Sequence, residues 1–404
     1  MNTMEGVTIE EAIKISCKYP LKKKTEITSL DDSIHRILAY DIVSKVNDPR
    51  FDNSSMDGWA VKSEDCKNQG TKLEIVGTNK TGNHRSYSIQ SGQACRIMTG
   101  APMPKGADAI VIIEDSDIQE NNVIINGPAR TAYVRKCGEN ISKGDKSLAG
   151  GTMLNSAEIS LSATIGYDEL EVIQKPKIAI ISNGDELVKP GDILLDGQIY
   201  ESNSFGLAAL IKKIGCEPIR FDIVQDSIEG LRNVLDQASE TCDAILTSGG
   251  VSMGKWDMVR KIMEEEGEIK FWKIKMRPGG PPLFGKWKET PLFGLPGNPV
   301  SSHVVFTMIV FPWISYSLGF NGENGPKLAD KVNVVLKNPL KGAPDKVCLR
   351  RIKITNENGV LKATTKTHQG SGNINSMVVH NGLSLLPPNE DAKSGEIIEA
   401  LWLR

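Results

Sequence analysis

Hydrophobic and polar positions follow two different periods along the chain. From Lys177 onward, short apolar runs alternate with stretches of helical spacing, in the order KIAIIS, SFGLAALIKKIG, EPIRFDIVQ, SIEGLRNVLDQASE, DAILTS, WDMVRKIMEEEG and FWKIKM. That order predicts βαβ units and a mainly parallel sheet with helices on both faces. The stretch after Ser227 carries an apolar stripe that includes Leu231 and Leu235, and Ser227 is placed to cap the helix.

Two other regions show the period of two that is typical of strands. Residues 47–140 contain TKLEIVG, ADAIVIIED and NVIING between Gly, Asn and Asp, which predicts a small β domain. After Pro326 the runs VNVVL, VCLRRIKI, VLKATT, LSLLP and EIIEALWL predict a C-terminal β-barrel or sandwich. Helical stretches flank the β insert, namely IEEAIKIS, DDSIHRILAY and SAEISLSATIG. We expect the segments 1–46 and 141–176 to pack together, with the β domain inserted between them.

Composition excludes several classes of protein. A chain of 404 residues is too long for one core, and its 48 basic and 50 acidic residues provide no field that attracts nucleic acid or a membrane surface. The apolar stretch from His303 to Leu318 includes Pro312, which favours a buried helix over a membrane span. The N-terminus has no charged-then-apolar signal pattern, so we expect a cytoplasmic protein. Seven scattered cysteines without a CxxC pair, and five isolated histidines, indicate neither a disulfide framework nor a zinc site.

The first motif with candidate chemistry is TSGGVSMGKWD, residues 247–257, directly after the apolar run DAIL. Gly249 and Gly250 allow a tight turn and a close approach to a ligand, because neither carries a Cβ. Hydroxyl groups stand beside backbone N–H groups at an expected helix start, on Thr247, Ser248 and Ser252. The stretch therefore outlines an anion site, and Asp257 could hold a magnesium ion against a phosphate or oxyanion. A tight turn with a capping acid is the alternative.

Two proline-glycine loops follow later apolar strands: MRPGGPP at 276–282 and GLPGNPVSS at 294–302. Their prolines, Pro296 among them, fix φ and make the loops rigid, and rigid loops can position ligands. Arg277 can form a bidentate contact with a phosphate or oxyanion, and Asn298 and Ser301 can donate hydrogen bonds at the start of the apolar helix. Stiff turns that serve packing are the alternative.

Acidic residues also stand at strand ends. Glu186 follows KIAIIS in ISNGDELVKPG, and Asp226 follows FDIVQ. A single acid at such a place is usually a cap or a solvated turn residue. Several acids beyond one sheet edge, facing an anion site, favour a divalent cation. In the β insert, Asp57 in DNSSMDGWA and Thr99 in RIMTGAPMPKG are further candidates, with ordinary polar turns as the alternative.

Seven motifs in order resemble those of the molybdopterin molybdenumtransferase family, MoeA, which includes the gephyrin E-domain. They are DNSSMDGWA, RIMTGAPMPKGADAIVIIED, SNGDELVKPG, IYESNS, TSGGVSMGKWD, MRPGGPPLFGK and FGLPGNPVSS, and the match extends over essentially the whole chain. The resemblance implies a multi-domain α/β and β fold. It has four parts: a helical linking domain (1–46 plus 141–176), an inserted β domain (47–140), a central α/β molybdopterin-binding-type domain with a mainly parallel sheet (177–326) and a C-terminal β-barrel domain (327–404). Within the linking domain, the first residues, to about position 20, could pack on the α/β domain instead.

The resemblance also implies an activity. It is the insertion of molybdate, or tungstate, into adenylylated molybdopterin, with magnesium-dependent cleavage of the adenylate and release of AMP. A homodimer is implied, with each active site between the α/β domain of one subunit and the inserted domain of the other. Asp57 and Thr99 would then complete the partner's pocket. Carried over motif by motif, Ser248, Gly249, Gly250 and Ser252 would cradle the pterin phosphate; Asp257, Asp226 and Glu186 would hold Mg²⁺ or orient water; Arg277, Asn298 and Ser301 would face the oxyanion or dithiolene end.

The chain departs from the family pattern at three places. Asn140 in RKCGENIS stands where the family commonly has an acid. RPGGP stands where the family commonly reads KPGKP, so that Arg277 keeps a positive charge and Gly280 loses one. Because of these departures, a second interpretation stays open: the protein is a non-catalytic paralogue that binds the cofactor and transfers it to another protein, or that acts as a scaffold for a partner. A molybdopterin adenylyltransferase is a further alternative, although it would need only the α/β domain. The choice between molybdenum and tungsten stays open.

Overall fold

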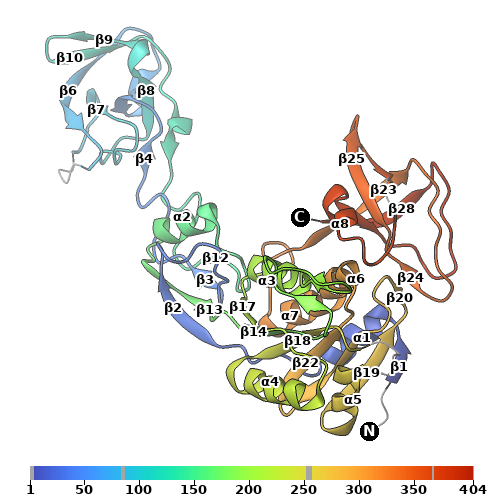
Figure 1. The fold of residues 1–404 in the computed structure, drawn as a ribbon. Coiled ribbons are helices and arrows are strands. Elements are labelled where there is room, and N and C mark those ends of the chain that lie inside the picture. Colours follow the sequence, from blue (N-terminus) through green and yellow to red (C-terminus); the bar gives the residue numbers. More distant parts are fainter. Residues whose placement is uncertain (1–3, 83–86, 252–256, 366–367, 404) are drawn as a thin grey trace.

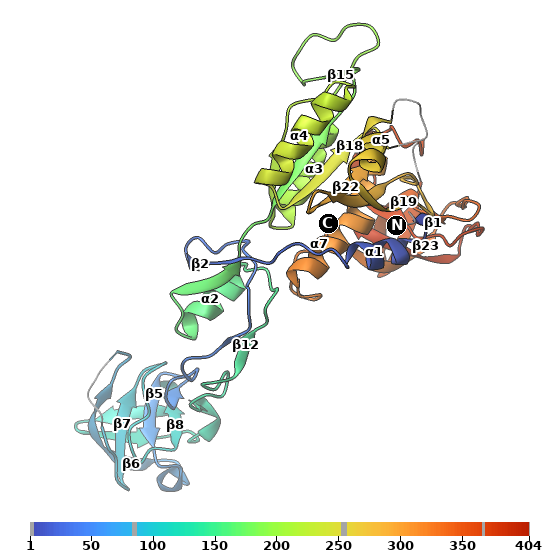
Figure 2. The same ribbon diagram turned by 90° about the horizontal axis from the view of Figure 1, so that it is seen from below.

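The computed structural model of the chain describes residues 4–82, 87–251, 257–365 and 368–403 (Figure 1). The molecule is elongated. An inserted β domain lies at one end, an α/β domain at the other, and a β-barrel beside the α/β domain. Figure 2 shows the inserted domain projecting away from the α/β domain in a second view as well. The two β domains are therefore attached to the α/β domain from different directions.

The α/β domain is built on a seven-stranded mixed sheet. Its strands, in spatial order, are β1 (Met4–Val7), β19 (Glu268–Ile274), β21 (Leu283–Trp287), β22 (Thr290–Leu295), β18 (Ala244–Ser248), β14 (Lys177–Ser182) and β17 (Glu217–Arg220). The pairs β1·β19, β22·β18, β18·β14 and β14·β17 are parallel, whereas β19·β21 and β21·β22 are antiparallel. The prediction of a mainly parallel sheet is confirmed, and the N-terminal strand joins its edge.

Helices cover both faces of this sheet because side chains alternate along its central strands. Ile178 and Ile180 belong to the core under α1 (Ile9–Ser16), α3 (Asn203–Lys213) and the long helix α6 (Pro299–Val305), η4 (Phe306–Val310) and α7 (Phe311–Leu318). Ala179 and Ile181 belong to the core under α4 (Ile228–Thr241) and α5 (Met258–Glu265). Ser227 caps α4 through the N–H of Gly230.

The long apolar helix, Pro299–Leu318, is the one helix of the described residues that could cross a membrane by length and composition. Its side chains Phe306 and Trp313 are fully buried, and they pack in the same core as Phe293 of the central sheet. Trp313 contacts Phe293 at a ring-centre distance of 5.0 Å. The prediction of a buried helix is confirmed, since its large side chains Phe306 and Trp313 are covered by the domain itself.

The linking region consists of paired outgoing and returning segments. Its elements are β2 (Thr25–Ser29) with β13 (Glu169–Ile173), β3 (Ile42–Val43) with β12 (Lys146–Leu148), β4 (Asn53–Ser54) with β11 (Val134–Arg135), and α2 (Ser156–Thr164). The helix expected over residues 31–40 is not formed, and that expectation was wrong. Ile37 and Leu38 are instead bridged to Met153 and Val172 and buried, because pairing with the returning segment satisfies their backbone groups.

The inserted domain is a six-stranded sheet. Its strands, in spatial order, are β8 (Ala109–Ile112), β5 (Gly58–Val61), β7 (Gln93–Ile97), β6 (Thr71–Asn79), β10 (Asn122–Ile125) and β9 (Ser116–Gln119). Three 3₁₀ turns accompany it, η1 (Ser63–Cys66), η2 (Ile113–Asp115) and η3 (Thr131–Tyr133). Trp59, Leu73 and Val111 form the centre of its core.

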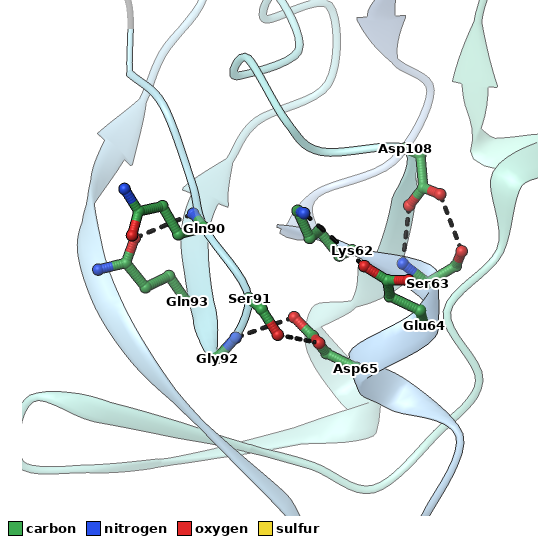
Figure 3. A network of polar contacts seen from close by, with 9 residues as sticks. All are labelled: Lys62, Ser63, Glu64, Asp65, Gln90, Ser91, Gly92, Gln93 and Asp108. Atoms are coloured by element: carbon green, nitrogen blue, oxygen red, sulfur yellow. Dashed lines mark hydrogen bonds and ion pairs between the residues drawn. The ribbon is translucent and has the colours of Figure 1, made fainter.

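A network of exposed polar side chains holds η1 against neighbouring loops (Figure 3). The carboxylate of Asp108 accepts hydrogen bonds from the Ser63 N–H and hydroxyl at 2.7 and 2.8 Å. The carboxylate of Asp65 accepts from the Ser91 hydroxyl at 2.7 Å and the Gly92 N–H at 2.9 Å. Two segments distant in sequence are thereby joined through one short helical turn.

Removing one of these carboxylates is expected to weaken the inserted domain. Asp65→Ala leaves the Ser91 and Gly92 donors without their acceptor and should lower the free energy of unfolding by about 1–2 kcal/mol in urea denaturation. The matched control is Glu64→Ala, because Glu64 makes only an exposed ion pair with Lys62 at 3.7 Å. An equal loss in both variants would contradict the structural role of the Asp65 contacts.

The C-terminal domain is a closed barrel, which confirms the first of the two predicted β architectures. Its strands are β23 (Ala329–Leu336), β26 (Val360–Thr364), β25 (Arg351–Glu357), β27 (Gly382–Ser384) and β28 (Ile397–Leu403), with α8 (Asn375–Val379) beside them. A short parallel pair, β20 (Met276–Arg277) and β24 (Val347–Cys348), links the RPGG loop to the barrel. A second small parallel pair, β15 (Leu187–Val188) and β16 (Ile199–Tyr200), lies between β14 and α3 along the chain.

Candidate active site

The candidate site lies beyond the carboxyl ends of β14, β18 and β22, where ligands bind in open α/β sheets. A cavity of about 260 Å³ is found there. It brings together seven of the residues predicted for the site, namely Glu186, Asp226, Asp257, Gly249, Gly250, Pro296 and Asn298. A neighbouring cavity of about 520 Å³ shares Asn183, Glu186 and Asn298 with the first, and it includes Ser248. The loops after three adjacent strands therefore form one continuous site.

The SGG turn has the backbone conformation that its glycines predict. Gly249 and Gly250 have φ values of +102° and +66°, in the region that favours glycine. A Cβ on Gly250 would lie 2.9 Å from the Asn183 amide nitrogen and 3.0 Å from a Val259 methyl group. The Gly249 N–H donates to the Leu295 carbonyl at 3.0 Å, so this amide serves the fold. The expectation that the turn offers its amides to an anion does not hold for Gly249, because β22 takes this donor.

Substituting this turn is expected to be costly. Gly250→Ala requires a left-handed backbone with a Cβ and a contact shorter than van der Waals distance, and should lower the free energy of unfolding by about 1–3 kcal/mol. Gly322→Ala is the control, since the space around Gly322 is open and its φ is not positive. Urea denaturation of both variants measures the difference, and equal stabilities would contradict the strained geometry.

The hydroxyl groups of the first motif have different surroundings. The Ser248 hydroxyl accepts a hydrogen bond from the Asn203 amide at 2.8 Å, and the same amide donates to the Gly297 carbonyl at 2.7 Å. Asn203 thus joins the SGG loop to the PGN loop. Thr247 is fully buried and lines neither cavity, and its hydroxyl has no hydrogen-bond partner among the described residues. Ser252 lies outside the described residues.

Sequence reasoning missed three polar residues of the larger cavity: Asn183, Glu201 and Asn203. Glu201 is buried, and its carboxylate accepts from the Ser182 hydroxyl at 3.0 Å and from the Ser204 N–H and hydroxyl at 2.7 and 2.6 Å. It thereby ties the end of β14 to the start of α3. The IYESNS motif could have indicated Glu201 and Asn203 as site residues. An acid followed by Ser-Asn-Ser at a helix start can both cap the helix and line a cavity.

The three predicted metal-binding carboxylates line one cavity from three different loops. Glu186 is exposed and Asp226 half-buried, and Asp257 is the N-cap residue of α5. No group of three or more His, Cys, Asp or Glu side chains in the described part of the chain is arranged to hold a metal ion. Mg²⁺ commonly uses only one or two protein carboxylates and completes its shell with substrate phosphate and water. The donor set therefore fits an ion that binds together with a phosphorylated ligand.

The proline-glycine loops contribute unequally. Pro296 and Asn298 line the smaller cavity, and Asn298 is also the N-cap residue of α6. Ser301 is buried in α6 and lines neither cavity. Arg277 is exposed on β20, which pairs with β24 of the C-terminal domain. It also lies outside both cavity linings, so that the structure does not bring it together with the acids.

Asp57 and Thr99 form a pair within the inserted domain. One carboxylate oxygen of Asp57 accepts from the Thr99 N–H at 2.6 Å and from its hydroxyl at 2.9 Å. These hydrogen bonds, with the charge of Arg96, hold the pKa of Asp57 below its ordinary value, so the side chain is ionised at neutral pH. Both residues are exposed, and neither lines the cavities of its own chain. Asn140 lies outside these cavities too, and its amide donates to Asp48 at 3.0 Å.

The fold and the site together define a class of multi-domain protein. Its α/β domain has a cavity at the strand ends, and the same chain contains an inserted β domain and a C-terminal barrel. Three family models match in the same order along the chain. The MoeA N-terminal region (domain I and II) matches residues 7–166, a probable molybdopterin binding domain matches residues 179–316, and the MoeA C-terminal region (domain IV) matches residues 333–403.

Known proteins agree with these matches. A molybdopterin molybdenumtransferase of Haemophilus influenzae is 33% identical over 397 residues, which cover 97% of each chain. One of a Nostoc species is 38% identical over 306 residues, which cover 74% of this chain and 70% of the relative. A solved structure of a MoeA protein of molybdopterin biosynthesis from Pyrococcus horikoshii has a TM-score of 0.83 at 30% identity, with 99% of each chain covered. The chain belongs to the MoeA family.

Proposed function

We propose that this protein is a molybdopterin molybdenumtransferase, which inserts molybdate into adenylylated molybdopterin and releases AMP. The observation that most supports this proposal is one cavity. It is lined by the Gly249–Gly250 turn and by the acids Glu186, Asp226 and Asp257. A phosphoanhydride next to molybdate is a dense cluster of negative charge, and such a reaction needs fixed dipoles and cations around it. Two relatives named for this activity match 97% and 98% of this chain.

The residues of the site would have different roles in binding the substrate and the metal ion. Ser248, held by Asn203, and the SGG turn would bind the pterin phosphate, with Ser252 as a further contact. Asp257, Asp226 and Glu186 would hold Mg²⁺, which when bound polarises the phosphoanhydride and offsets its charge. Asn298 would donate its side-chain amide to the molybdate or dithiolene end, with Pro296 holding that loop rigid. Arg277 and Ser301 would act from outside the cavity walls, by charge and by packing of α6 respectively.

We also propose that the protein acts as a cytoplasmic homodimer with shared sites. The ionised Asp57 and the Thr99 hydroxyl are exposed on the inserted domain. The cavity of the same chain belongs to the α/β domain, which lies at the other end of the molecule (Figure 1). A second copy could place its inserted domain over that cavity and complete it. The nearly balanced charge of the chain supports small-molecule substrates without a nucleic acid or membrane partner.

One assay tests the proposed activity. The purified protein receives adenylylated molybdopterin, Mg²⁺ and molybdate, and we expect AMP release together with active cofactor. A carrier or scaffold would bind the nucleotide-linked pterin without releasing AMP, and an adenylyltransferase would consume ATP instead. Replacing molybdate with tungstate in the same assay determines the metal preference. Binding without AMP release under all these conditions would overturn the proposal.

A further inference from the structure

Trp272, on β19, is a buried aromatic residue behind the SGG loop. Its indole N–H donates a hydrogen bond to the Val251 carbonyl at 3.2 Å, and its side chain is almost fully buried. Val251 lines the smaller cavity directly after Gly249 and Gly250, whereas Trp272 is not among the residues that line it. A group outside the site thus fixes one end of the loop that carries the candidate anion turn.

The same ring also contacts the residues that follow Asp257. The guanidinium carbon of Arg260 lies 3.5 Å from the ring centre, and the ammonium of Lys273 lies 3.8 Å from it. The backbone N–H of Arg260 also donates a hydrogen bond to the backbone carbonyl of Gly250 at 3.1 Å. Arg260, in the first turn of α5, is therefore attached both to the glycine turn and to the indole.

We infer that Trp272 and Arg260 are positioning residues that set the separation between the Gly249–Gly250 turn and the Asp257 carboxylate. Trp272 contacts the chain on both sides of Asp257, at Val251 before it and at Arg260 after it. Asp257 would hold Mg²⁺ next to a phosphate bound at the turn, and Mg²⁺ sites tolerate little change in the spacing of the groups that hold the ion. This inference rests on the proposed function for its consequence in catalysis, but its geometric content can be measured independently.

A matched pair of variants separates positioning from packing. Trp272→Phe removes the indole N–H and keeps an aromatic ring under Arg260. Trp287→Phe is the control, because Trp287 is equally buried in the same core and donates its indole N–H to Asp236 at 2.7 Å, away from the cavity. Both substitutions should lower the Tm by a similar amount, about 2–6 °C.

Only Trp272→Phe should alter the site. We expect its kcat to fall about 10- to 100-fold, with a higher Mg²⁺ concentration for half-maximal turnover, while Trp287→Phe stays within about twofold of the wild type in both. Arg260→Lys, which keeps the charge but not the planar stack, should shift both values in the same direction by a smaller factor. Equal turnover and equal Mg²⁺ dependence in the two tryptophan variants would overturn the inference.

Hydrogen exchange provides a readout that does not depend on activity. The Arg260 amide, bonded to Gly250, should exchange at least about 10-fold faster in Trp272→Phe than in Trp287→Phe, since its opening is local. If the wild type releases no AMP but this difference is observed, the positioning role stands and the proposed function fails. If the wild type is active and exchange is the same in both variants, the positioning role is wrong.

Discussion

Asp257→Asn is expected to reduce AMP release about 100- to 1,000-fold at saturating substrate. The substitution keeps the shape of the side chain and removes its charge at the wall of the smaller cavity, where a divalent ion would bind beside phosphate. Asparagine is as good an N-cap residue as aspartate, so α5 should form normally and the Tm should change by less than about 2 °C. A titration with Mg²⁺ should show a higher concentration for half-maximal turnover in whatever activity is left.

The control for this prediction is Asp222→Asn. Asp222 follows β17 in the same domain, but it lies outside both cavities of the site and pairs with Lys189 on the surface at 2.7 Å. Its loss should leave turnover unchanged, because an exposed ion pair contributes little and touches no substrate. Turnover of Asp257→Asn at the wild-type rate would remove Asp257 from the site and, with it, the magnesium assignment.

Asp57→Ala is expected to be inactive alone and to regain activity when mixed with Asp257→Ala. In a dimer with shared sites, a heterodimer of the two variants contains one site with both aspartates intact and one site that lacks both. Random exchange of subunits makes half of the dimers heterodimers, so turnover should return to about a quarter of the wild-type value. Coexpression with two different affinity tags, followed by purification through both, would raise this to about half.

The alternative arrangement gives a different result. If Asp57 acted on the cavity of its own chain, every chain in the mixture would lack one essential carboxylate and the mixture would stay inactive. Two wild-type controls are required, one with each tag, to show that the tags leave turnover unchanged. Size measurement of each single variant verifies that the loss of Asp57 or Asp257 has not prevented dimer formation.

Much of the fold follows from periodicity in the sequence. The apolar runs from Lys177 onward predicted the mainly parallel sheet, and the later runs predicted a β domain that is a closed barrel. Residues 31–40 show where this reasoning fails. Their spacing resembles a helix, but Ile37 and Leu38 pair with a segment more than a hundred residues later. Local pattern cannot reveal such a partner, because backbone hydrogen bonds with a distant segment outweigh a weak local propensity.

The candidate site was predicted in part. Glu186 and Asp226 were chosen because each follows the end of an apolar run, and Asp257 because it stands at the expected start of the next helix; all three do line one cavity. Thr247 was chosen as a hydroxyl beside backbone N–H groups at an expected helix start, but it lies inside β18, where its side chain is enclosed by the domain. Asn203 was not chosen, because its importance comes from two contacts, with Ser248 and Gly297, that span loops far apart in the chain.

By itself the sequence determined where strands end and which glycines, acids and hydroxyls follow them, because alternation, helical spacing and turn chemistry are local properties. Only the tertiary structure decided which of these side chains open into the same cavity and which are covered. The reason is that β14, β18 and β22 become neighbours only through strand pairing, and successive residues of a strand point in opposite directions. Thr247 is therefore enclosed in the core, whereas the next residue, Ser248, lines the larger cavity.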